Sequence, residues 1–183
     1  MSGRSPARRA AGFSLIELLA VVGILIVLVT LLFPAVARLM RVTEVRRTQV
    51  EVNRIADAIR SYYMECGQFP YPGQPSHWYH NTEANLRTMY ERLSDPAQNR
   101  ARRVFLDLPL DEDGLLRDPW GNFYRVILFD PDKNARIGGD GWAGSGSEVT
   151  STGGQIAVVR SLGPNGVLDP FSASGSDDIL SFK

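Results

Sequence analysis

Residues 12–37, GFSLIELLAVVGILIVLVTLLFPAVA, decide the architecture of this chain. From Leu18 to Ala37 they contain twenty consecutive residues without a charge. Twenty helical residues at about 1.5 Å each span roughly 30 Å, the thickness of a bilayer core. The first twelve residues include three arginines and no acid. A basic leader followed by an apolar segment indicates targeting to a membrane or anchoring in it.

Three interpretations of this beginning stay open: a cleaved signal peptide, a permanent anchor, and a leader cleaved ahead of the apolar segment. Ala35-Val36-Ala37 has the A-x-A form of a signal-peptide cleavage site, but the apolar segment exceeds the usual length of about 7–15 residues. Glu17 lies among apolar residues, where an ionised carboxylate costs a few kcal/mol. An acid in that position predicts a functional role.

The composition excludes several classes of protein. The 183 residues contain 20 Lys+Arg and 20 Asp+Glu, so the net charge is zero and we expect no nucleic-acid partner. The single cysteine excludes an intramolecular disulfide framework and any multi-cysteine metal centre. The sequence holds no nucleophile elbow, phosphate loop or dinucleotide-binding motif, so we predict no catalytic residue and no enzymatic activity.

A helical pattern continues beyond the apolar segment. We predict one helix from about 14 to 65, ended by Gly67 and Pro70 and kinked at Pro34, which removes a backbone donor. Its second half is amphipathic and should pack against a head domain. The apolar face of that half consists of Val42, Val45, Val52, Ile55, Ala56, Ile59, Tyr62 and Tyr63.

The rest of the chain predicts a small head of mixed structure. A helix is expected at 82–94, a short edge strand at 104–106, and strands at 123–129, 155–161 and 178–182, with a glycine-rich loop at 137–154. Three antiparallel strands cannot cover both of their faces, so one face should lie on the long helix, which gives an α+β fold. The predicted organisation is a leader at 1–12, an assembly helix at 13–37, its amphipathic continuation at 38–66, an insertion at 67–117 and a sheet with its C-terminal loop at 118–183.

Residues 12–19, GFSLIELL, closely resemble the processing site of the type IV pilin and type II secretion pseudopilin superfamily. The resemblance implies that a prepilin peptidase cuts after Gly12 and that the new terminus, Phe13, is N-methylated. It makes Glu17 the fifth mature residue, which selects the next subunit during filament growth. A carboxylate that neutralises the terminal amine of a neighbouring subunit would also set the axial register between helices.

Three later motifs resemble the major pseudopilin of type II secretion: residues 118–122 (DPWGN), 161–166 (SLGPNG) and 177–179 (DDI). The resemblance implies a pilin-like fold, a single-pass protein of the bacterial inner membrane with its globular domain in the periplasm, and a helical filament that helps to export folded proteins. The implied partners are further copies of the chain, the prepilin peptidase, minor pseudopilins and the inner-membrane assembly platform. The missing cysteine pair argues against a typical type IV pilus pilin.

The same resemblance implies a calcium ion in the loop between the last two strands. Its candidate ligands are the backbone carbonyl of Leu162 and the side chains of Asn165, Asp169, Asp177 and Asp178, because Ca²⁺ prefers oxygen donors. Asn165 stands where the family often has aspartate, which should weaken binding. The alternative is an ordinary turn without an ion.

Two other functions stay open at this point. One is a major or minor subunit of a type IV pilus for adhesion or DNA uptake. The other is a secreted calcium-binding or sugar-binding module cleaved after Ala37. The first residue of the mature protein separates the filament subunit, which begins at Phe13, from the secreted module, which begins at Arg38.

Overall fold

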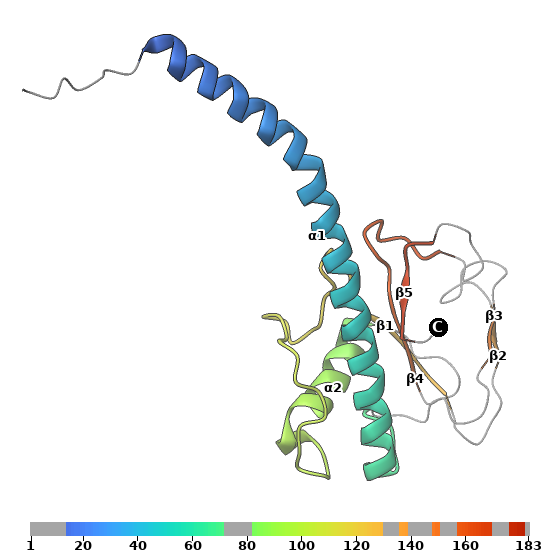
Figure 1. Cartoon of the computed structure of the whole chain (residues 1–183). Coiled ribbons are helices and arrows are strands. Elements are labelled where there is room, and N and C mark those ends of the chain that lie inside the picture. Colours follow the sequence, from blue (N-terminus) through green and yellow to red (C-terminus); the bar gives the residue numbers. More distant parts are fainter. Residues whose placement is uncertain are drawn as a thin grey trace, which may run out of the picture. The chain divides into compact units, whose positions relative to one another are not determined.

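The computed structural model of the chain describes residues 14–71, 82–129, 136–138, 148–150, 157–169 and 176–181. The chain divides into two compact units, Met1–Val42 and Thr43–Lys183. Helix α1 (Leu15–Cys66) contributes to both units, and the other elements belong to the second (Figure 1). A long N-terminal helix with a small antiparallel sheet makes this an α+β protein, which confirms the predicted fold class.

The long helix has nearly the predicted bounds. Helix α1 runs without interruption through Pro34 and ends at Cys66. Gly67 adopts a left-handed φ of 65°, and its N–H donates to the carbonyl of Tyr63 at 2.8 Å. A residue without a Cβ takes this conformation at low cost, so glycine ends the helix here.

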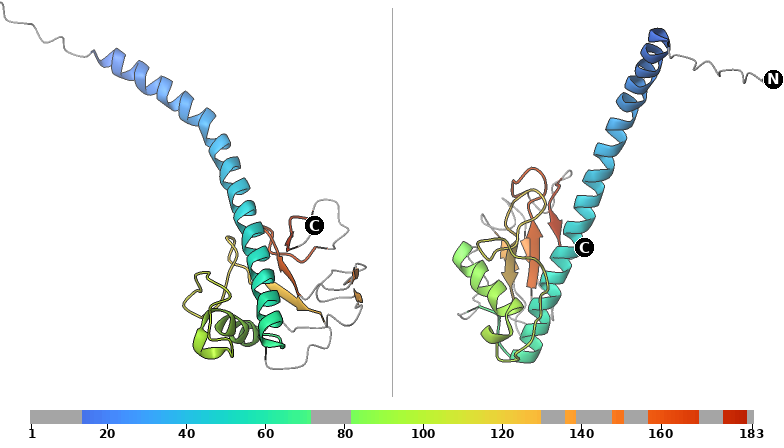
Figure 2. Two further views of the ribbon diagram at one scale, coloured as in Figure 1. Left: turned by 60° about the horizontal axis from the view of Figure 1, so that its bottom comes forward. Right: turned by 90° about the vertical axis from the view of Figure 1, so that its left-hand side faces the viewer.

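The core of the second unit forms between α1, α2 (Glu83–Ser94) and the sheet, as Figures 1 and 2 show. The predicted apolar face of α1 is buried only from Val52 onward. Val42 and Val45, which were predicted to belong to this face, are about two-fifths exposed. Ala58, which the pattern missed, is buried in place of Ala56. The α1 residues in the core are Val52, Ile55, Ala58, Ile59 and Tyr62.

The main sheet has three antiparallel strands in the order β1-β4-β5. They are β1 (Arg125–Leu128), β4 (Ala157–Ser161) and β5 (Ile179–Leu180), and each lies within its predicted range. Val126 pairs with Val159, and Ser161 pairs with Ile179. Val126, Val159 and Ile179 all belong to the core that includes α1, so one face of the sheet packs on the helix as predicted.

Two predictions about local structure are wrong. The glycine-rich segment 137–154 is not simply a loop, because β2 (Arg136–Gly138) and β3 (Glu148–Thr150) pair within this part of the chain, with Ile137 opposite Val149. Residues 104–106 form no strand. The N–H groups of Phe105 and Leu106 instead both donate to the carbonyl of Leu93, at 2.8 and 3.0 Å, which folds this segment back onto the end of α2.

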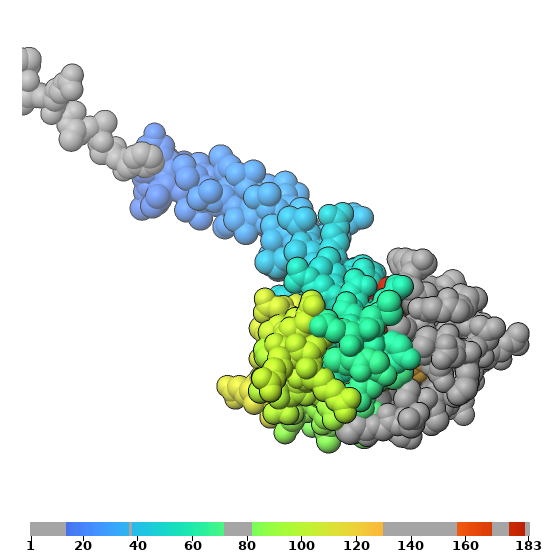
Figure 3. Space-filling model, turned by 90° about the horizontal axis from the view of Figure 1, so that it is seen from below, coloured from blue at the N-terminus to red at the C-terminus, as the bar shows by residue number. Residues whose placement is uncertain are grey.

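Helix α2 is positioned by its cap and by its apolar face. The Thr82 hydroxyl accepts a hydrogen bond from the N–H of Asn85, at 3.4 Å, as an N-cap residue does. A 3₁₀ turn, η1 (Pro96–Gln98), follows the helix. Figure 3 shows α2 and the chain after it packed closely against the last turns of α1. The buried residues of α2 are Leu86, Met89, Tyr90 and Leu93.

Polar contacts fix α1 against the sheet. The Tyr124 hydroxyl donates to Glu51 Oε2, and the amide of Gln49 donates to the carbonyl of Leu180 at 2.7 Å. Burial, and secondly the hydrogen bond with the Glu51 carboxylate, raises the pKa of Tyr124. Since Glu51 also pairs with Arg47 at 2.8 Å, this partly buried acid has both a hydrogen-bond donor and a cation beside it.

Truncation of the core tests this packing. Ile59→Ala removes a fully buried side chain and should lower the free energy of unfolding by about 2–5 kcal/mol. Val50→Ala is the matched control, because Val50 is 52% exposed on the same helix, and it should change that value by less than about 0.5 kcal/mol. Urea unfolding of the full chain in detergent, followed by circular dichroism, measures both. Equal losses for the two variants would contradict the assignment of this face.

Candidate functional site

The first candidate site is the beginning of α1. Ser14 precedes the helix, and its N–H donates to Glu17 Oε2 at 3.0 Å, while the N–H of Glu17 donates to the Ser14 hydroxyl at 3.3 Å. This reciprocal pair is a capping box, and a carboxylate in the first turn also interacts favourably with the helix dipole. The Ser-x-x-Glu spacing in the sequence indicates this capping box, which was not anticipated. The predicted processing residues, Gly12 and Phe13, lie outside the described residues.

The apolar stretch that follows is helical and exposed. Large side chains such as Leu15, Phe33 and Leu31 are 83%, 74% and 70% exposed. None of the most apolar window of α1 is buried by other described parts of the chain, and the helix is long and apolar enough to cross a membrane. Pro34 lies within this helix, where it leaves the carbonyl of Thr30 without its usual helical donor. Soluble monomers rarely expose an apolar surface of this extent, and the stretch is compatible with a membrane-spanning helix.

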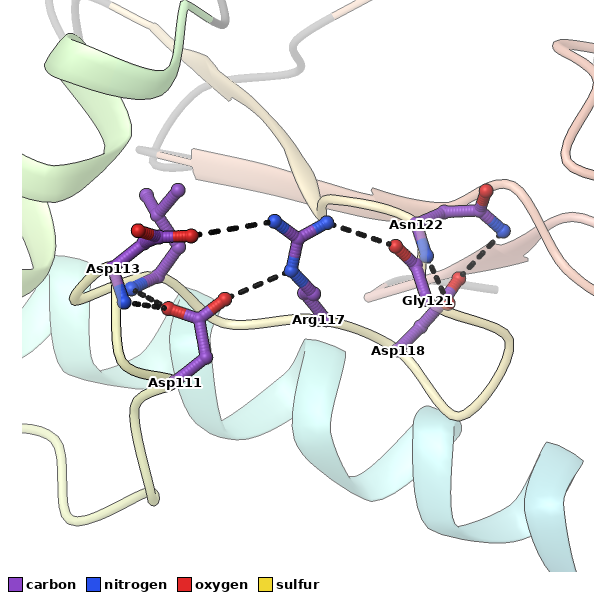
Figure 4. Close-up of polar contacts among 7 residues, drawn as sticks. Asp111, Asp113, Arg117, Asp118, Gly121 and Asn122 are labelled. Carbon is purple, nitrogen blue, oxygen red and sulfur yellow. Dashed lines mark hydrogen bonds and ion pairs between the residues drawn. The ribbon is translucent and has the colours of Figure 1, made fainter.

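The second candidate site is built on the turn at 118–122, shown with its neighbours in Figure 4. Asp118 is only 4% exposed, and its Oδ1 accepts from the N–H groups of Trp120 and Asn122, at 3.1 and 2.8 Å. The preceding residue, Arg117, donates to Asp111 Oδ2 at 2.8 Å and to the carbonyl of Gly121 at 3.2 Å. Hydrogen bonds, first of all one from the N–H of Leu115, lower the pKa of Asp111.

This turn holds the loop that follows β4. The Ser161 hydroxyl donates to Asp118 Oδ2 at 2.7 Å and accepts from the N–H of Gly163 at 3.1 Å. The amide of Asn122 donates to the carbonyl of Gly163 at 3.1 Å. Two motifs 40 residues apart in the sequence, residues 118–122 and 161–166, are therefore one hydrogen-bonded unit in the structure.

The loop brings three predicted ligands together. Asp169, Asp177 and Asp178 each have a carboxylate oxygen within 4.8 Å of the others. The N–H of Asn165 donates to Asp177 Oδ2 at 3.1 Å, and that of Asp169 donates to Asp178 Oδ2 at 3.0 Å. Asp177 Oδ1 and Asp178 Oδ1 are buried and have no hydrogen-bond partner among the described residues. In each of these two carboxylates, Oδ2 accepts a hydrogen bond from a backbone N–H of the loop, and Oδ1 has no partner among the described residues.

The other predicted ligands have different positions. Leu162 is buried directly after β4 and next to Gly163. The amide of Asn165 faces Asp169 with its nitrogen, which donates to Asp169 Oδ2 at 3.3 Å, while its oxygen accepts from the N–H of Val167 at 2.7 Å. In this arrangement Asn165 organises the carboxylates of the loop by donating hydrogen bonds to them.

A buried cation beside the cluster was not anticipated. Arg160 on β4 is fully buried, and its Nη2 donates to both the Asp178 carboxylate and the carbonyl of Asp169. Burial, and secondly the nearby charge of Arg125, lowers the pKa of Arg160 to about 10. The sequence signal was an arginine inside the apolar strand AVVRS, which predicts a paired charge but does not identify its partner.

No protein-family model matches the chain, and neither a curated protein nor a solved structure matches it.

A glycine substitution tests the geometry of the loop. A Cβ on Gly163 would lie 2.4 Å from the carbonyl oxygen of Asp177, whereas one on Gly121 would meet nothing within 4 Å. Both residues have positive φ, so both alanine variants carry the backbone strain, of roughly 1 kcal/mol, but only Gly163→Ala adds the clash. Gly163→Ala should lose about 3 kcal/mol of unfolding free energy, against about 1 kcal/mol for Gly121→Ala. Thermal unfolding of the full chain measures the difference, and equal losses would refute the close approach.

Proposed function

We propose that this chain is a pilin-like subunit of a type II secretion-like pseudopilus. In this proposal it is cleaved after Gly12, N-methylated at Phe13, held in the inner membrane by α1 with its head in the periplasm, and assembled into a helical filament. Its partners are then the prepilin peptidase, the membrane, minor pseudopilins, the inner-membrane assembly platform and further copies of itself.

One observation carries the proposal: an uncharged, exposed helical surface begins directly after a motif that resembles a prepilin processing site. The membrane covers such a surface while the subunit is alone, and neighbouring helices cover it in a filament. The same helix continues into the head, where its last turns form part of the core. A subunit of this kind can move from membrane to filament without refolding its head.

The capping box supports a specific role for Glu17. In the isolated subunit the carboxylate accepts the N–H of Ser14, so its charge is partly compensated within its own chain. Cleavage after Gly12 releases an amine on Phe13, a cation that is costly beside lipid unless it is paired. Pairing this amine with Glu17 of a neighbouring subunit holds the two helices in one axial register.

N-terminal sequencing of the protein purified from its native host tests the proposal. We expect methylated Phe13 as the first residue. A mature chain beginning at Arg38 would overturn the proposal in favour of a secreted module, and an uncleaved Gly12–Phe13 bond would overturn it as well.

Two variants at the start of α1 separate the ion pair from the cap. Glu17→Gln retains an oxygen that can accept from Ser14 but removes the charge, so it should be processed normally and fail to form filaments. Ser14→Ala removes one half of the capping box, worth about 1 kcal/mol, and keeps the charge, so filaments should still form. Electron microscopy and shearing assays count filaments, and immunoblots follow processing. Normal filaments from Glu17→Gln would defeat the register argument.

We further propose that the loop around Asp177 and Asp178 binds calcium, which would add structural stability and no chemistry. Two buried carboxylate oxygens without a hydrogen-bond partner among the described residues suit a hard cation, as does the proximity of Asp169. The residues that would hold the ion are Asp169, Asp177 and Asp178, with the carbonyl of Leu162 as a further candidate.

Removal of one carboxylate tests this proposal. Asp177→Ala should abolish most of the calcium-dependent rise in Tm, because it deletes a ligand whose buried Oδ1 has no hydrogen-bond partner in the described part of the chain. Asp113→Ala is the control, since that carboxylate is 68% exposed and lies outside the loop, and it should retain the native response. Melting curves with calcium and with chelator measure the effect. A native chain whose Tm is the same with calcium and with chelator would refute the calcium site.

A further inference from the structure

The buried guanidinium of Arg160 is a cation within the acidic loop, in addition to the calcium ion proposed above. The inference drawn from it rests on that proposed calcium site. Arg160 and Asp178 both have fully buried side chains and form an ion pair. Arg160 also donates to the carbonyl of Asp169, and the N–H of Asp169 donates to the same Asp178 oxygen at 3.0 Å. The three residues form a closed ring of hydrogen bonds that joins the two ends of the segment between 169 and 178.

The ring determines which oxygens remain for an ion. Asp178 Oδ2 already accepts two hydrogen bonds, whereas its Oδ1 is buried and without a hydrogen-bond partner among the described residues. Asp178 can therefore ligate a cation through one oxygen only, while it keeps Arg160 on the other. This gives one carboxylate two cationic partners on opposite oxygens.

The charges of the cluster agree with this arrangement. The three carboxylates contribute three formal negative charges and Arg160 contributes one positive charge, so these four groups keep a net negative charge that favours a cation. Without an ion, the guanidinium lowers the repulsion among carboxylates that lie within 4.8 Å of one another. A guanidinium with a fully buried side chain is costly unless an acid compensates it, and the Asp178 carboxylate does so.

We propose that Arg160 is an internal cation that closes the acidic loop before calcium binds, and that it limits the affinity of the loop for calcium. A chain with Arg160 then keeps its head folded when calcium is scarce. A chain without it depends on the ion for loop closure, because the hydrogen bond from the N–H of Asp169 does not by itself compensate the buried charge of Asp178.

The test compares Arg160→Met with the native chain in detergent, by thermal melting in chelator and in calcium and by calorimetric titration with CaCl₂. We expect the Tm in chelator to fall by about 10 °C, because Asp178 loses its buried partner. The calcium-dependent rise in Tm should become larger than that of the native chain, and the Kd for calcium should fall about tenfold. Arg103→Met, which removes a 59% exposed arginine paired with Glu65, should match the native chain in both measurements.

Each outcome decides a different claim. Equal calcium responses of Arg160→Met and the native chain would overturn the role of Arg160 alone. No response in either chain would overturn both this role and the calcium site. The filament proposal would be unaffected, because N-terminal sequencing tests it separately. If Arg160→Met fails to fold in chelator, recovery in calcium supports the proposal. If Arg160→Met fails to fold in chelator and in calcium, the double variant Arg160→Met with Asp178→Asn should restore folding. Its calcium response should be weaker than that of the native chain. A double variant that does not fold would refute the pairing of Arg160 with Asp178.

Discussion

Apolar surface along α1 must be removed from water, and the two parts of the helix meet this constraint in different ways. From Val52 onward the apolar side chains are buried against α2 and the three-stranded sheet. In the uncharged part they remain exposed, and no described residue covers them. The part from Val52 onward gives the head its core. The uncharged part leaves an exposed apolar surface, which lipid covers in the proposed membrane state and neighbouring helices cover in the proposed filament.

The head depends in turn on a small number of buried polar groups. Asp118 joins the turn at 118–122 to Ser161, and Ser161 holds the N–H of Gly163. That contact places the loop so that the carboxylates of residues 169, 177 and 178 converge. A buried carboxylate that accepts four hydrogen bonds restricts the loop more strongly than its short strands could, because leaving any of these donors unpaired costs free energy.

Periodicity and turn chemistry were sufficient to predict the long helix, its end at Gly67, the helix at 83–94, the three strands and the α+β class. These features depend on local preferences and on which face is apolar. The pairing of β2 with β3 was missed because that stretch is rich in glycine and each short strand has a single large apolar residue, Ile137 in β2 and Val149 in β3. The strand expected at 104–106 failed because hydrogen bonds to Leu93 compete with strand pairing. The acids of the loop were predicted from motifs, whereas the partnership of Arg160 with Asp178 was not, since it joins residues that only the tertiary fold brings together.

The last residue of α1 has a practical consequence. Cys66 is the single thiol of the chain, and it is partly buried against the core at the point where the helix ends. A spin label or a crosslinker attached there reports from one defined height in each molecule. Distances between such labels in an assembled sample would give the spacing and rotation from one molecule to the next without any engineered cysteine.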